Sequence, residues 1–123
     1  MNFNLLSMKW LHKALVGGLL LLPLSGFAAQ PEVVASIKPL HSLVAGVMQG
    51  IGEPLLLVPG GASPHDYSLR PSDARTLNQA QVVFWIGPEL ESFLVKPLHN
   101  AKDKVLAVAL LDSPGVITLP LRE

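Results

Sequence analysis

Among the side chains that could carry chemistry, the histidines after residue 29 stand out: His41, His65 and His99. His65 lies in a polar loop, residues 61–67, directly after an apolar run. Pro64 stiffens the backbone just before the imidazole, and an imidazole nitrogen is a suitable ligand for a borderline metal such as zinc. A single loop histidine is more often a solvated or hydrogen-bonded residue, so these residues alone make His65 a candidate metal ligand and no more.

The positions of the other polar residues make them weaker candidates for metal ligands than His65. His41 lies in the first turn of an expected helix, where a cation is disfavoured, and it is expected to bond to backbone or water. His99 lies near a helix end and is expected to be solvated. Asp66 and Glu89 could supply carboxylate ligands, although solvated charges are the more usual finding for such residues. No two histidines have the close helical spacing of a metal pair.

The sequence offers little for catalysis. Ser63 precedes His65 by only two positions, which is too close for the opposed nucleophile and base of a catalytic triad. Gly60 and Gly61 form a turn rather than a phosphate-binding loop, and neither a nucleophile elbow nor an HExxH sequence is present. The chain is therefore predicted not to be an enzyme.

The elements that must position these residues alternate along the chain. Short apolar runs predict four strands, at 33–37, 55–58, 82–86 and 105–110. Apolar residues at helical spacing predict three helices: one over 40–51, one with Ser72 as its N-cap, and one through Leu90 and Phe93 that ends before Pro97.

Strand–helix alternation of this kind predicts an α/β fold, a parallel sheet with helices on both faces. Right-handed crossovers place the carboxyl ends of the strands at one edge, where open α/β sheets bind ligands. The loop 59–71 leaves one of these ends, so function is expected there. In this loop Tyr67 is expected to donate to an adjacent carboxylate or to pack under the loop, whereas Phe84 and Trp85 belong to the expected core.

Composition restricts the class of protein. Of the 123 residues, 50% are hydrophobic and 15% are charged, and the mean hydropathy is +0.44. The chain is therefore too apolar for a disordered tail and too poor in charge for a nucleic-acid binder, and its length suits one domain. After residue 28, seven basic and nine acidic side chains remain, so the charge indicates no polyanionic partner.

Residues 1–28 are typical of a cleavable secretory signal. Lys9 and Lys13 precede a short apolar segment, 14–24, and small residues then allow cleavage after Ala28. The apolar segment is too short to span a bilayer, which needs roughly 20 residues. The chain contains no cysteine, so it has neither a disulfide nor a lipid-modified cysteine as a tether. These features predict a periplasmic protein without a membrane anchor.

The mature part, residues 29–123, is small for the predicted fold. Four strands form only half of a sheet, with both edges open unless something covers them. The segment 113–123 is interrupted by prolines and brings no closing element. The sequence is therefore expected to be interrupted rather than complete.

Three segments resemble the high-affinity zinc-uptake binding proteins (ZnuA-type), which capture metal for ATP-driven importers. Residues 34–43 resemble the first strand and helix of that family, residues 59–73 its first metal loop, and residues 85–91 the segment after the next helix. The metal-loop sequence is highly specific, whereas the other two would be weak evidence alone. The resemblance covers nearly all of the chain after residue 28, in the same order.

This resemblance implies that residues 29–123 are the N-terminal lobe of a two-lobed periplasmic protein whose lobes are joined by a long rigid helix. Such a protein would bind Zn²⁺ in the cleft as a monomer and hand it, as cargo, to a membrane permease. His65 falls on the family's first histidine ligand. Pro64 stands where many zinc-specific members have a glutamate, which leaves manganese or another divalent metal as an alternative, although residues 68–73 favour zinc.

Members of the family continue into a loop rich in histidines and acidic residues, the linking helix and a second lobe, which supply two further histidines and usually a carboxylate. Zinc sites of this kind need three or four protein ligands, and the resemblance places one of them, His65, in this chain. The chain by itself is therefore not expected to bind zinc tightly. A truncated remnant with no transport role is the other alternative.

Overall fold

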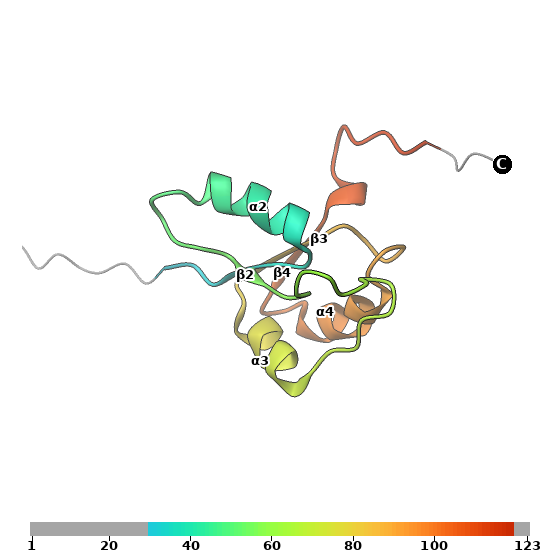
Figure 1. The fold of residues 1–123 in the computed structure, drawn as a ribbon, viewed down its shortest axis with the longest axis horizontal. Helices are drawn as coiled ribbons and strands as arrows, with labels where there is room; N and C mark the ends of the chain where they lie inside the picture. The colour runs from blue at the N-terminus through green and yellow to red at the C-terminus, as the bar shows by residue number, and fades with distance from the viewer. Residues whose placement is uncertain (1–29, 120–123) are drawn as a thin grey trace, which may run out of the picture.

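The computed structural model describes residues 30–119, so the predicted signal peptide, 1–28, lies outside the described part of the chain. Figure 1 shows a central sheet with helices on both sides of it. The four strands of this sheet are parallel and lie in the order β2-β1-β3-β4. They are β1 (Val33–Ala35), β2 (Leu55–Leu56), β3 (Val82–Trp85) and β4 (Leu106–Ala109). The predicted parallel α/β fold is confirmed.

Helices cover the two faces of the sheet unequally. Helix α2 (Lys38–Val47) packs on one face, and α3 (Pro71–Gln79) and α4 (Val95–Ala101) pack on the other. Two short 3-10 turns, η1 (Ser92–Leu94) and η2 (Leu110–Asp112), precede α4 and follow β4. Among the described helices, none combines the length and the apolar content needed to span a bilayer.

The sheet divides the core into two clusters of apolar side chains. On the side of α3 and α4, Val34, Val83 and Leu94 have no exposed surface. Trp85 is also buried on this side, and Phe84 is half-buried against the cluster beneath α2. Both aromatic residues therefore belong to the core, as predicted.

Helix α2 buries a narrower face than the sequence predicts. Leu40, Val44 and the adjoining Met48, spaced by four residues, pack on the sheet. Leu43 and Val47, predicted to share that face, are 70% and 83% exposed. Within residues 30–119, α2 is the only α-helix on its side of the sheet, where the short 3-10 turn η2 adds Leu110 to the cluster. The outer flank of α2 therefore has no second α-helix to pack against.

Helix α2 begins two residues before the predicted helix 40–51 and ends at Val47, four residues before its predicted end. Two further helix boundaries differ from the prediction, both at prolines. The prediction that Pro97 ends a helix is wrong, because α4 contains Pro97 in its first turn and continues to Ala101. The first N–H groups of a helix have no intrahelical acceptor, so a proline there removes no hydrogen bond. The prediction that Ser72 is an N-cap is also wrong, because Pro71 is the first residue of α3 and Arg70 precedes it as the N-cap.

The second predicted strand is shorter and more exposed than expected. Leu55, on the edge strand, is 51% exposed, whereas Leu57 and Val58 are buried. Pairing with the neighbouring strand nevertheless continues past β2, because Leu57 N–H donates to Ala35 O at 3.0 Å and Val58 N–H to Ser36 O at 2.8 Å. These bonds bring the start of the predicted functional loop to the carboxyl end of β1.

Candidate metal-binding site

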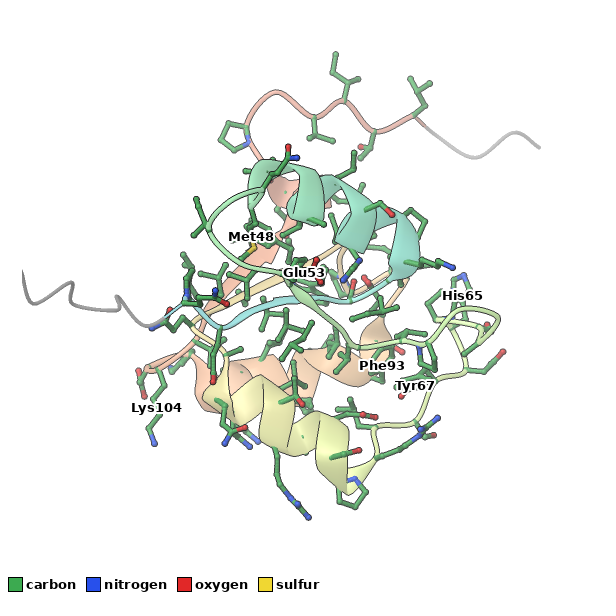
Figure 2. All side chains as sticks on the ribbon, turned by 60° about the vertical axis from the view of Figure 1, so that its left-hand side comes forward. Met48, Glu53, His65, Tyr67, Phe93 and Lys104 are labelled. Atoms are coloured by element: carbon green, nitrogen blue, oxygen red, sulfur yellow. The ribbon has the colours of Figure 1, made fainter. Side chains whose placement is uncertain are left out.

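His65 lies on the loop of residues 59–70, which connects the carboxyl end of β2 to α3. Figure 2 shows His65 on the outer part of this loop, with Tyr67 and Phe93 closer to the body of the molecule. The side chain of His65 is exposed. Its imidazole is therefore free to take a ligand that approaches the carboxyl edge of the sheet.

His65 occupies the corner of a tight turn. Asp66 N–H donates to Ser63 O at 3.3 Å, and Pro64 and His65 are the two central residues. Proline is favoured at the first central position because its φ is fixed near the required value. Ser63 Oγ also donates to the Asp66 carboxylate at 3.3 Å, a second bond across the turn. These contacts restrict the backbone that carries the imidazole.

Tyr67 attaches this turn to the rest of the fold. Its phenol donates to Asp73 Oδ2 at 2.8 Å and also lies 3.4 Å from Leu57 O. Its ring packs edge-on against Phe93, with ring centroids 5.3 Å apart and an interplanar angle of 62°. Both parts of the prediction for Tyr67 are confirmed, since it donates to a carboxylate and packs under the loop. Tyr67, which makes these contacts, lies only two residues after His65, so the turn that carries His65 is attached to the fold close to the imidazole.

The carboxylate of Asp73 is a shared acceptor at the start of α3. It accepts Arg70 N–H at 2.9 Å in addition to the Tyr67 phenol. Burial raises the pKa of Asp73, but the hydrogen bonds from Arg70 and Tyr67 outweigh burial, so the pKa lies below its ordinary value of 3.8. Burial and the bond to Asp73 together raise the pKa of Tyr67 above 10.0. The pair is therefore a neutral phenol on an ionised carboxylate at neutral pH.

Asp73→Asn is expected to make the unfolding free energy less dependent on acid pH. A carboxyl whose pKa is lowered by folding stabilises the fold above its unfolded pKa, 3.8, and this stabilisation is lost as the pH falls through the folded value. The difference between the two proteins should therefore be largest near neutral pH and should shrink below about pH 4. Urea unfolding across this range measures it, with the exposed Asp103→Asn as control. A difference that is constant with pH would contradict the prediction.

A small hollow lies beside the loop, and its lining offers no metal ligands. It has a volume of about 290 Å³ and opens between the start of the loop and the first turn of α2. Pro64 and Lys38 contribute to its lining, and His65 does not. Because neither a histidine nor a carboxylate lines it, the hollow offers no donor set for a metal ion.

The described residues do not assemble a complete donor set around His65. Among residues 30–119, no group of three or more histidine, cysteine, aspartate or glutamate side chains is placed to hold a metal ion. His41 Nε2 lies 2.8 Å from Pro54 O, which confirms the predicted backbone contact. His99 is exposed on α4, as predicted, and Glu89 is exposed as well. A metal bound at His65 would need further ligands from outside this range.

Sequence reasoning missed one polar residue at the same edge of the sheet. Glu91 has no exposed surface and is hydrogen-bonded to Ser36, which is also fully buried. Nothing in the sequence distinguishes Glu91 from its exposed neighbour Glu89, because its side-chain partner, Ser36, is 55 residues away in the sequence. Spacing along one chain does not report such long-range contacts.

Comparison with known proteins gives a family match over most of the chain. Residues 33–119 match the family model described as "ZnuA: Zinc-uptake complex component A periplasmic". The curated protein called high-affinity zinc uptake system protein ZnuA from Brucella abortus is 45% identical over 119 residues, covering 94% of this chain and 36% of the relative. The protein of the same name from Yersinia pestis is 45% identical over 106 residues, 85% of this chain and 33% of the relative. The chain thus spans about a third of the length of these relatives.

Solved structures with a similar fold are periplasmic metal-binding proteins. The periplasmic zinc binding protein TroA from Treponema pallidum has a TM-score of 0.68 and 26% identity, covering 75% of this chain and 34% of that chain. The Mn-bound periplasmic metal binding protein from candidatus liberibacter asiaticus has a TM-score of 0.66 and 20% identity, covering 76% and 34%. The latter likeness concerns the fold alone.

Proposed function

Because the chain belongs to the ZnuA family of periplasmic zinc-uptake components, we propose that it forms the N-terminal lobe, residues 29–123, of the substrate-binding protein of a zinc ABC importer. This protein captures Zn²⁺ in the periplasm and delivers it to a membrane permease. The observation that supports the proposal most directly is the exposed imidazole of His65 on an anchored loop at the carboxyl edge of the sheet. That edge is where open α/β sheets bind their ligands.

His65 acts in this proposal as one neutral imidazole ligand to the transported Zn²⁺. Protein zinc sites use three or four ligands, and the part of the protein outside this chain supplies the others. The relatives are long enough for this, since this chain covers only 36% of the Brucella abortus protein. Imidazole also suits zinc better than manganese, which prefers oxygen ligands. The proposed cargo is therefore zinc, and the manganese alternative is the less favoured one.

The proposed role is binding and delivery without catalysis. The cleavable signal of residues 1–28 exports the protein, and release after Ala28 leaves it in the periplasm as a monomer that docks on the permease. Support comes from the family description, which names a periplasmic component of a zinc-uptake complex. N-terminal sequencing of the periplasmic protein is expected to begin at Ala29. A protein that keeps its first 28 residues would contradict the export step.

Calorimetric titration of the metal-free full-length protein with Zn²⁺ and with Mn²⁺ tests the proposed function. We expect one saturable zinc site that is tighter than any manganese site. The 123-residue chain, which has one of the proposed ligands, should bind zinc orders of magnitude more weakly than the full-length protein. A full-length protein that binds no zinc, or that binds manganese more tightly, would contradict the proposal.

A further inference from the structure

A buried carboxylate lies at the carboxyl edge of the sheet, on the segment between β3 and η1. Glu91 has no exposed surface, and its two oxygens accept three hydrogen bonds. Ser36 Oγ donates to Oε1, and the backbone N–H groups of Ile86 and Gly87 donate to Oε2 at 2.9 and 3.1 Å. A buried carboxylate is costly unless its lone pairs are satisfied, and here the Ser36 hydroxyl and two backbone N–H groups bond to them.

This carboxylate sits at the point where the sheet reverses its strand order. From β1 the chain runs outward to β2 on one side, and β3 and β4 lie on the other side. In open α/β sheets the crevice outside the carboxyl ends at this reversal is the usual ligand site, and backbone N–H groups there often bind anions. Ser36 directly follows β1 and Ile86 directly follows β3, so Glu91 bridges the two sides of that crevice.

We propose that Glu91 is an internal anion that fills the crevice at the strand-order reversal and positions the loop that carries His65. The connection to the loop is short. Ser36, which donates to Glu91, also accepts Val58 N–H at 2.8 Å, and Val58 is the last residue before the loop begins at Pro59. The carboxylate thereby links Ser36, which follows β1, to Ile86 and Gly87, which follow β3, at the start of the loop. The effect on zinc rests on the proposed function, whereas the filling of the crevice does not.

Chemical rescue tests the filling of the crevice. Glu91→Ala removes the carboxylate and leaves the Ser36 hydroxyl and two N–H groups facing an empty space, which formate is small enough to enter. A ligand that binds only the folded state raises its melting temperature. Formate should therefore raise the melting temperature of purified Glu91→Ala by several degrees relative to chloride at equal ionic strength, and should leave the unsubstituted protein unchanged. An equal response of both proteins would overturn the proposal.

Two further variants serve as controls for the formate experiment. Glu91→Gln can still accept the N–H groups of Ile86 and Gly87 and can donate to Ser36, so it should keep most of the stability and show no formate response. Glu89→Ala, on the exposed neighbour, should behave like the unsubstituted protein. If Glu91→Ala does not fold in chloride, formate during refolding should restore the folded circular dichroism spectrum. No recovery in formate would contradict an anion-binding crevice.

Zinc binding by the full-length protein tests the positioning role separately. Glu91→Ala should bind zinc several-fold more weakly than the unsubstituted protein in chloride. Most of this difference should disappear when both proteins are measured in formate, because formate replaces the missing carboxylate in the crevice. A variant that is rescued in stability but shows unaltered zinc affinity would exclude the positioning role. If the unsubstituted protein binds no zinc, the proposed function fails, and the melting-temperature experiment still decides whether formate enters the crevice.

Discussion

Replacing His65 by alanine is expected to weaken zinc binding by the full-length protein about 100- to 1000-fold. Structural zinc sites bind with apparent free energies of about 10–16 kcal/mol shared among three or four protein ligands, or about 2.5–5 kcal/mol for each. The middle of this range, about 3–4 kcal/mol, corresponds to the expected loss of affinity. Loss of one imidazole nitrogen leaves water in its place. His65 is exposed, so its truncation leaves no cavity in the core, and the melting temperature of the metal-free protein should not change.

Competition with a chromogenic chelator at constant pH measures this loss of affinity. His99→Ala is the matched control, because His99 is also an exposed histidine but lies on α4 rather than on the loop. The control should bind zinc like the unsubstituted protein. If His65→Ala held zinc as tightly as His99→Ala does, the assignment of His65 as a ligand would be abandoned.

The parallel sheet was predictable because its signal is local. Each strand of a covered parallel sheet is a short apolar run, and the runs at 33–37, 82–86 and 105–110 contain β1, β3 and β4. The exposure of Leu43 and Val47 was not predictable in the same way. Periodicity shows which side chains share a face of a helix, but the number of helices on a sheet face depends on contacts between distant segments.

The errors at prolines have a different origin. Proline is compatible with the first turn of a helix and is also common just after its end. A proline in the sequence can therefore mark either the start or the end of a helix. Pro97 lies in the first turn of α4, where the segment before it folds as the 3-10 turn η1. Pro71 displaces Ser72 from the N-cap in the same manner. The sequence therefore places α3 correctly apart from its first residues, whereas α4 lies mostly after the helix that was predicted.

The candidate site was predictable in part. The restricted backbone at Pro64 and the donor role of Tyr67 follow from residues close together in the sequence, and the structure contains both. His65 as a ligand came from family resemblance, because a single loop histidine carries no spacing signal. Glu91 was missed since its partner Ser36 is 55 residues away. Local patterns reveal turns, whereas a buried polar contact between distant segments requires the fold.

Leu94→Ala is expected to destabilise the fold by about 2–5 kcal/mol, the range for removing a buried leucine side chain and leaving a cavity. Leu94 has no exposed surface and packs with Val34, Val83 and Trp85 between the sheet and α4. A small domain has only about 5–15 kcal/mol of stability, so the loss is a large share of it. Leu43→Ala, at a leucine that is 70% exposed, should change stability by about 0.5 kcal/mol or less.

Urea unfolding of these variants, followed by the fluorescence of the buried Trp85, measures both effects. Equal destabilisation by Leu94→Ala and Leu43→Ala would contradict the assigned core.

The effect of zinc on the melting temperature distinguishes a core residue from a metal ligand. A ligand that binds only the folded state adds stability according to its affinity, and Leu94 offers no metal donor. In the full-length protein, zinc should therefore raise the melting temperature of Leu94→Ala as much as that of the unsubstituted protein, and should raise that of His65→Ala far less. The opposite order would mean that zinc binding depends on the core rather than on the imidazole of the loop.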